Sequence, residues 1–216
     1  MVWKMIGYAA EGSVLILTGM AGIRYLQGKE CFSSKKRGLL FVAAMTVILL
    51  GVWAALHMLY PDNFWLVNMR LLFVASILWP VALRDLQEHV IPNKIVAAGC
   101  VFWLLTIAIQ LFVSTETVFA SFLNSVIAAA GIFVVCLLCM LIAKGSVGMG
   151  DAKLLFMMGL LQGINGLFSA VFFSLIVSFV EACVLLIAKK RTRKDGMSFG
   201  PAVLVGTTIS IVLTGM

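Results

Sequence analysis

The segment KGSVGMGDAKLLFMMG, residues 144–159, interrupts the most apolar part of this chain. The 27 residues before it, 117–143, carry no charged side chain, and apolar residues resume directly after Lys153. A helix that crosses the hydrocarbon core of a membrane needs about 20 apolar residues. The segment is therefore predicted to be a polar break between two membrane helices, with the carboxylate of Asp151 where the second helix enters lipid.

The composition of the whole chain agrees with a membrane protein. Of its 216 residues 62% are hydrophobic and 12% charged, whereas soluble domains have about 45–50% apolar and about 25% charged residues. This composition excludes a soluble nucleic-acid-binding protein, despite the net charge of +7. The first apolar run is longer than a signal peptide and no A-x-A-like site follows it, so we expect a permanent span.

The apolar runs predict an all-α, polytopic transmembrane bundle of about eight spans. The sixth is short, and we expect it either to be tilted or to enter the membrane only part-way and turn at QGING, residues 162–166. The expected spans lie near residues 5–26, 38–60, 64–83, 94–114, 117–143, 151–162, 164–188 and 199–215.

Basic residues separate the two sides of this bundle. Of the 16 Lys and Arg residues, five lie in 24–37, two in 84–94, two in 144–153 and five in 189–194, which are alternate loops. Cytoplasmic loops are enriched in Lys and Arg. The rule predicts that these four loops are cytoplasmic and that both termini are outside.

Two carboxylates far apart in sequence fall on the predicted cytoplasmic side. Asp85 follows the third span in LRDLQEHVIPNK, residues 83–94, and Asp151 opens the sixth. Two neighbouring carboxyl groups share a proton, so that one can take a proton from water while the other gives one to a carbonyl. Such a pair hydrolyses an amide without metal or cofactor. Taken separately, Asp151 also fits a helix N-cap and Asp85 a solvated loop residue.

The residues beside each carboxylate suit this chemistry. Gly148 and Gly150 permit close backbone approach around Asp151, and a helix N-terminus favours an anion there. Pro92 prevents a regular helix through VIPN. From these features we expect Asp151 to be the more readily ionised member of the pair and Asp85 the more readily protonated one.

Three motifs in order resemble the type IV prepilin peptidases, which are intramembrane aspartic proteases of the GxGD type. They are D-L-x-x-x-x-I-P-N at Asp85–Asn93, G-x-G-D-x-K at Gly148–Lys153 and FGP at Phe199–Pro201. The resemblance implies an endopeptidase of the cell inner membrane that cleaves the basic leader of prepilins or pseudopilins at the cytoplasmic face. It implies that Asp85 and Asp151 are catalytic, and that prepilin and membrane lipid, but no nucleic acid, are the partners.

The remaining motif residues are expected to support the pair or to meet the substrate. The supporting residues are Gly148, Gly150, Lys153, Ile91, Pro92 and Asn93. The candidates for contact with substrate or for lining the cavity are Glu181, Phe199, Gly200 and Pro201.

The resemblance divides the chain into residues 70–216, a peptidase-like membrane domain, and residues 1–69, two spans of unknown role. Larger family members carry two Cys pairs in an N-terminal cytoplasmic loop associated with N-methylation. Here that region has the single Cys31, so the chain resembles the short, peptidase-only form.

Three smaller interpretations complete the sequence-based account. Cys136 and Cys139 form a C-x-x-C without a second pair, which favours helix packing over a zinc site. Glu11 and Arg70, both within predicted spans, are expected to pair with each other. The alternatives to a peptidase are an ion- or proton-coupled transporter, and a non-catalytic assembly factor that would tolerate loss of both aspartates.

Overall fold

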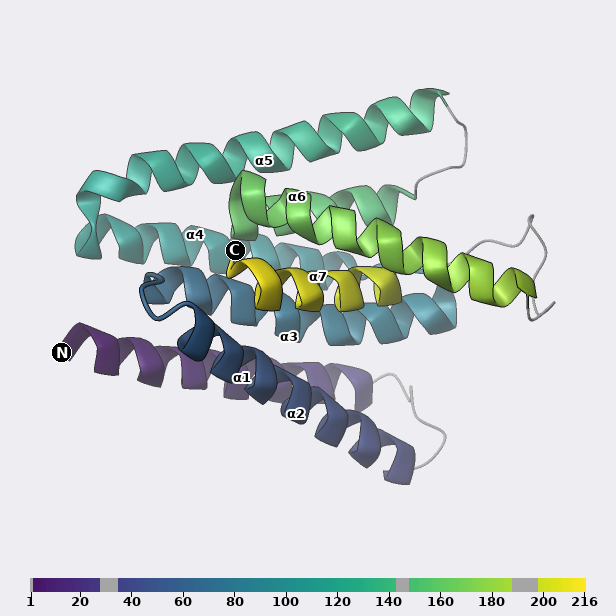
Figure 1. The fold of residues 1–216 in the computed structure, drawn as a ribbon, viewed down its shortest axis with the longest axis horizontal. Coiled ribbons are helices and arrows are strands. Elements are labelled where there is room, and N and C mark those ends of the chain that lie inside the picture. Colours follow the sequence, from purple (N-terminus) through teal and green to yellow (C-terminus); the bar gives the residue numbers. More distant parts are fainter. Residues whose placement is uncertain (1, 28–34, 143–147, 188–197) are drawn as a thin grey trace.

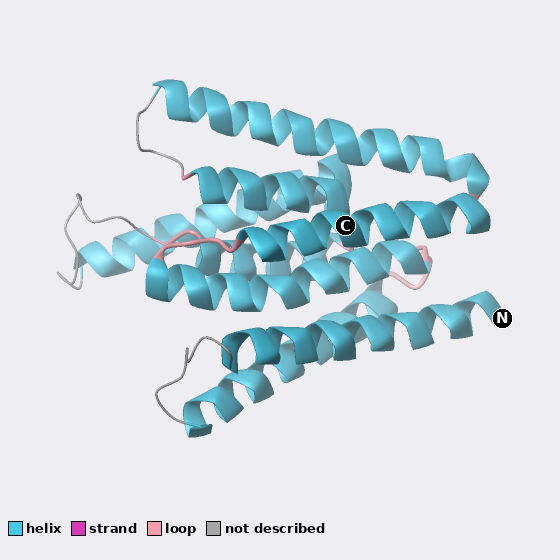
Figure 2. Cartoon of the chain, turned by 180° about the vertical axis from the view of Figure 1, so that it is seen from behind, coloured by secondary structure: helices cyan, strands magenta, loops and turns pink. Residues whose placement is uncertain are grey.

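The computed structural model describes residues 2–27, 35–142, 148–187 and 198–216, and this part of the chain is helical without strands. The basic residues Lys29 and Lys144 and the basic run 189–194, which support the predicted sidedness, lie outside the described residues, as does Cys31. Figure 2 shows the described part as helices joined by short loops. The helices are α1 (Val2–Gln27), α2 (Lys35–Leu59), α3 (Trp65–Glu88), α4 (Asn93–Val113), α5 (Thr115–Ile142), α6 (Met149–Ile187) and α7 (Gly200–Thr214).

Five described helical segments, in α2 to α6, are long and apolar enough to cross a membrane, and α7 is a shorter apolar helix. Inside lipid the backbone must satisfy its own hydrogen bonds, which an α-helix does within one segment. The prediction of an all-helical membrane bundle is therefore confirmed. The count of eight spans and the location of the termini stay predictions.

A glycine divides α6 into two helices. Gly163 has φ 70° and ψ −170°, which is not helical, and it lies inside the segment 162–166 at which the sequence predicts a turn. Figure 1 shows the ribbon of α6 reversing direction, so that its two halves lie side by side. Asn124 on α5 stabilises the break, because its Oδ1 accepts the N–H of Ile164 at 3.2 Å.

The helix α3 is the centre of the bundle. It contacts α1, α2, α4, α6 and α7, and 16 of its residues are buried. In Figure 1, α3 ends on the same side of the bundle on which α4, α6 and α7 begin. We call this side the motif end, because the three sequence motifs lie there. The opposite side, where α1 begins and α7 ends, is called the far end.

The prediction of a loop over residues 84–94 is wrong for residues 84–88, which are helical. The helix α3 continues to Glu88, and the N–H of His89 still donates to the carbonyl of Asp85 at 3.0 Å. No Pro or Gly interrupts residues 81–91, so nothing ends the helix until His89 turns into the left-handed region at φ 50°. Asp85 consequently lies in a helix, where its direction is fixed, and not in a solvated loop.

Candidate functional site

Asp85 is buried in the last turn of α3 and receives a hydrogen bond from the third motif. Its side chain is 5% exposed. The backbone N–H of Gly200, at the start of α7, donates to Oδ2 of Asp85 at 2.7 Å. Hydrogen bonds to a charged acceptor at this distance are about twice as strong as neutral ones. The FGP motif thus supplies a fixed donor to this carboxyl group.

Only glycine fits at position 200. A Cβ there would lie 2.9 Å from the Cβ of Asp85 and 3.3 Å from the Cα of Ala82. The neighbours of Gly200 explain the rest of the motif. Phe199 precedes the helix and packs against the main hydrophobic core, and Pro201 occupies the first turn, where its missing N–H has no helical partner to lose.

Asp151 lies in the first turn of α6 and is half-buried. The N–H of Gly148 donates to its Oδ2 at 3.3 Å, and the carbonyl of Gly148 accepts the N–H of Ala152 at 3.2 Å. This reciprocal arrangement resembles a helix N-cap, in which a side chain satisfies a free backbone donor. The contact from Gly148 is longer than the contact that Gly200 makes with Asp85.

The IPN residues pack on the GxGD segment. A Cβ at Gly150 would lie 3.3 Å from the Cβ of Ile91, so a larger residue would push the two segments apart. Lys153 Nζ donates to Asn93 Oδ1 at 3.3 Å. Pro92 is extended at the start of α4 and turns the chain from α3 into α4, which brings Ile91 and Asn93 against the first turn of α6.

The two carboxyl groups lie close enough to interact electrostatically. The structure therefore places Asp85 and Asp151 at one end of the bundle, with the three motifs in contact around them. The described residues contain no group of three His, Cys, Asp or Glu that could hold a metal ion.

Glu181 is not joined to this site by any hydrogen bond or ion pair within the described residues. It is half-buried in the second half of α6. Cys136 and Cys139 lie on α5 and are not joined in a disulfide, and their C-x-x-C brings together no metal site in the described part of the chain.

One pair beside the site escaped the sequence reasoning. Arg84 and Glu88 form an ion pair on α3, directly next to Asp85 in sequence, and Arg84 is buried. From sequence, Arg84 is only one of the two basic residues that mark the predicted loop 84–94 as cytoplasmic. The four-residue spacing of Arg84 and Glu88 would have indicated the pair if the helix had been predicted to reach Glu88.

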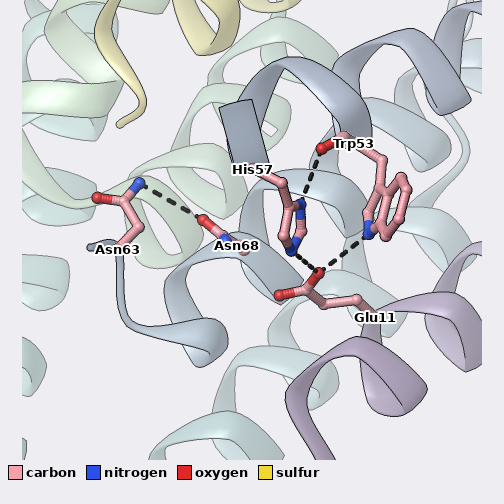
Figure 3. Close-up of polar contacts among 5 residues, drawn as sticks. All are labelled: Glu11, Trp53, His57, Asn63 and Asn68. Atoms are coloured by element: carbon pink, nitrogen blue, oxygen red, sulfur yellow. Dashed lines mark hydrogen bonds and ion pairs between the residues drawn. The ribbon is translucent and has the colours of Figure 1, made fainter. Parts of the chain in front are cut away.

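The expected pair between Glu11 and Arg70 is wrong. Glu11 is 1% exposed, and its Oε2 lies 3.1 Å from His57 Nε2 and accepts Trp53 Nε1–H at 3.1 Å. Figure 3 shows both rings, which belong to α2, facing the Glu11 carboxylate. Arg70 instead contacts uncharged residues of α4 and α5. Their positions within two predicted spans did not show toward which neighbouring helices the side chains of Glu11 and Arg70 point.

Figure 3 also shows Asn63 and Asn68 beside this cluster, where Asn63 Nδ2 donates to Asn68 Oδ1 at 3.4 Å. A pocket of about 490 Å³ adjoins them and is lined by Glu11 and His57 among others, but not by Asp85 or Asp151. The two N-terminal helices thus contribute buried polar groups to a part of the bundle that the carboxyl pair does not share.

The model of the type IV leader peptidase family matches residues 72–187, a range that includes both aspartates. A protein of Bacillus subtilis (strain 168), described as a prepilin leader peptidase/N-methyltransferase, is 28% identical over 136 residues. The match covers 62% of this chain and 52% of the relative, so the chain spans about half the length of that relative. No solved structure matches the chain significantly.

Proposed function

Because the chain belongs to the type IV leader peptidase family, we propose that it is an intramembrane aspartic endopeptidase that cleaves the basic leader of prepilins or pseudopilins. The observation that carries the proposal is that Asp85 and Asp151 lie at the same end of the bundle, each with a backbone N–H donating to one carboxyl oxygen. A transporter would need polar groups along a path across the membrane, whereas these two carboxylates share one end.

In the proposed reaction water is the nucleophile. One carboxylate takes a proton from water as the water oxygen bonds to the scissile carbonyl carbon. The other carboxyl group gives its proton to the carbonyl oxygen, which forms a tetrahedral diol. The first carboxyl group then gives the proton that it took from water to the amide nitrogen as the carbon–nitrogen bond breaks, and the second carboxylate takes a proton back from a diol hydroxyl as the new carboxylic acid forms. Both steps are general acid–base catalysis, and neither requires a metal or a covalent intermediate.

The hydrogen bonds favour an assignment of roles opposite to the one expected from sequence. Oδ2 of Asp85 is already an acceptor, at 2.7 Å from a backbone N–H, and Asp151 has the longer contact of 3.3 Å. We therefore assign Asp85 as the base that takes the proton of water. Asp151, half-buried at the start of α6, is assigned as the acid that protonates the carbonyl.

The proposed site of cleavage is the cytoplasmic face of the cell membrane. The distribution of Lys and Arg along the sequence supports this side for the loops of the motif end. A leader rich in basic residues would remain in the cytoplasm by the same rule, and the apolar helix of the pilin would lie in lipid beside the enzyme. The scissile bond would then stand at the membrane boundary, at the depth of the two aspartates.

Co-expression with a prepilin in membranes tests the proposal. The wild-type protein is expected to shorten the prepilin by its leader, visible as a size shift on a gel. Asp85→Asn and Asp151→Asn are expected to leave the prepilin uncut. Glu116→Gln is the control, because Glu116 is exposed in the first turn of α5 at the far end. If both aspartate variants cut the prepilin as fully as wild type does, the two aspartates are not catalytic, and the result would instead support the non-catalytic assembly factor.

A further inference from the structure

Glu11 is a buried carboxyl group at the far end that the carboxyl pair does not use. It lies on α1, and its side chain is 1% exposed. Its Oε2 lies 3.1 Å from Nε2 of His57 and accepts the indole N–H of Trp53 at 3.1 Å. Both partners belong to α2, and Figure 3 shows their rings turned toward the Glu11 carboxyl group. Glu11 therefore joins the two N-terminal helices, whose role the three motifs leave unexplained.

The contact of the other ring nitrogen shows where His57 carries a proton. Nδ1 lies 2.9 Å from the backbone carbonyl oxygen of Trp53. A carbonyl oxygen only accepts hydrogen bonds, so Nδ1 is the donor in this contact and carries a proton. A neutral imidazole has a single N–H, and its other nitrogen is an acceptor. In a neutral ring Nε2 therefore directs a lone pair at Oε2 of Glu11.

A proton must lie between Nε2 of His57 and Oε2 of Glu11. Two acceptors without a proton would repel each other at their separation of 3.1 Å. With the proton on Nε2, a histidine cation faces a carboxylate, whereas with the proton on Oε2 both groups are neutral. Either form leaves the pair without net charge. Burial favours both forms over a bare carboxylate, because a buried charge without a partner is costly.

No other described cation neutralises Glu11. Among the described side chains, no Lys or Arg lies within 4.0 Å of its carboxyl group. From α3 and α4, the uncharged Asn68 and Ser114 line the pocket of about 490 Å³ beside the pair. The other ionisable residues that line this pocket are Tyr8, Tyr60 and Asp62. His57 also lines the pocket and is 19% exposed, so the proton can exchange with water there.

We propose that Glu11 and His57 form a proton-binding site and that α1 takes up this proton when it docks on α2. In the separated state, glutamate releases its proton at about pH 4.3 and histidine at about pH 6.5. Above about pH 6.5 the docked pair holds a proton that the separated groups lack, so the docked state loses stability as the pH rises. The site lies at the end of the bundle that the basic residues predict to be outside, so it binds protons from that side. It is independent of the proposed peptidase reaction.

Nitrogen NMR of the His57 ring tests the position of its protons. The chain has two histidines, so the His89→Asn protein, isotope-labelled in histidine and held in detergent, reports on His57 alone. His89 is exposed at the motif end, and asparagine tolerates its left-handed φ of 50°. We expect Nδ1 of His57 to carry a proton at about pH 8, above the usual histidine transition. An Nδ1 without a proton would mean that Nε2–H donates to an ionised Glu11, which needs no additional proton, and would overturn the proposal.

The thermal midpoint in detergent, measured from about pH 6.5 to about pH 8.5, tests the uptake of the proton. For a chain of this size, one proton held only in the folded state lowers the midpoint by about 3–5 °C per pH unit. Wild type and His89→Asn are expected to show this slope. Glu11→Gln should show a flatter slope, because its amide N–H donates to the neutral His57 ring and has no proton to release. Groups elsewhere in the protein contribute equally to all variants, so the difference in slope isolates the pair.

Two further variants separate the proton from other causes of a changed midpoint. His57→Gln removes the ring and should flatten the slope as Glu11→Gln does, which a general loss of stability would not do. Lys4→Gln removes a cation two turns before Glu11 on the same face of α1 and should keep the wild-type slope. Equal slopes in wild type, Glu11→Gln and His57→Gln would contradict the proposal. A slope that is lost only in Lys4→Gln would assign the proton to Lys4 and would contradict it as well.

Discussion

Replacing Gly200 by alanine tests how strictly the FGP motif positions Asp85. The added Cβ would lie 2.9 Å from the Cβ of Asp85, where ordinary contacts are 3.4–4 Å. Asp85 or α7 would have to move by about 0.5–1 Å, which breaks the 2.7 Å hydrogen bond. Misplacing a catalytic group by about 1 Å costs up to about 100-fold in rate. We therefore expect kcat for leader cleavage to fall about 100-fold with KM nearly unchanged.

The assay is cleavage of a purified prepilin by reconstituted protein, together with a thermal unfolding curve for each variant. The overpacking itself is expected to cost about 1–3 kcal/mol of stability, so the folded fraction must be measured. Gly131→Ala is the matched control, because a Cβ at Gly131 on α5 meets nothing within 4 Å. Alanine also favours a helix over glycine by roughly 1 kcal/mol. A folded Gly200→Ala protein that cleaves as fast as wild type would refute the reasoning.

Further variants test other parts of the account. Lys153→Ala should lower the cleavage rate by less than about tenfold, since an exposed contact such as its 3.3 Å bond to Asn93 stabilises by at most about 1 kcal/mol; a loss as large as that of Asp151→Asn would give Lys153 a catalytic role. Glu11→Ala should destabilise the protein by about 3 kcal/mol in a thermal melt, because it leaves buried partners unpaired. Its rate of cleavage per folded molecule should stay at the wild-type value. Gly163→Ala should lower the thermal midpoint, because φ 70° is strained for alanine and its Cβ would clash with the side-chain amide of Asn124; an unchanged midpoint would argue against the break in α6. Treatment with EDTA should leave cleavage unchanged, whereas inhibition that added metal reverses would contradict the metal-free mechanism.

The surroundings of Asp151 could be predicted from sequence because their causes are local. Gly148, Gly150 and Asp151 lie within four residues. A glycine-rich break before an apolar run predicts a helix whose first turn holds a carboxylate that accepts a free backbone N–H. The reversal at Gly163 was predictable for the same reason. Glycine and asparagine residues interrupt an otherwise continuous apolar pattern there.

The surroundings of Asp85 depend on contacts that no local pattern reveals. Its hydrogen-bond donor, Gly200, is 115 residues away in sequence. Its burial follows from the central position of α3, which the sequence does not show. Charge alone suggested that the helix ends before Arg84, but α3 continues to Glu88, and Arg84 and Glu88 form an ion pair within it. The expectation about which aspartate is ionised rested on local features and lacked this distant donor.

The partners of the polar residues at the far end could not be predicted from local sequence either. Their positions within predicted spans suggested that Glu11 and Arg70 pair with each other. The partners of a buried charge also depend on how each helix is rotated about its axis, and apolar helices give little sign of that rotation. The His57 ring of α2 lies against Glu11, and Arg70 turns toward α4 and α5.

The central claim is that Asp85 and Asp151 act as one catalytic unit. Its most direct test is single-turnover cleavage of a prepilin by reconstituted wild type, Asp85→Asn, Asp151→Asn and the double variant. Residues that act as a unit are strongly non-additive, so each single variant is predicted to fall to the background rate of the double variant. A single variant that cleaves within about tenfold of wild type, while well folded, would show that the other carboxylate works alone and would contradict the account.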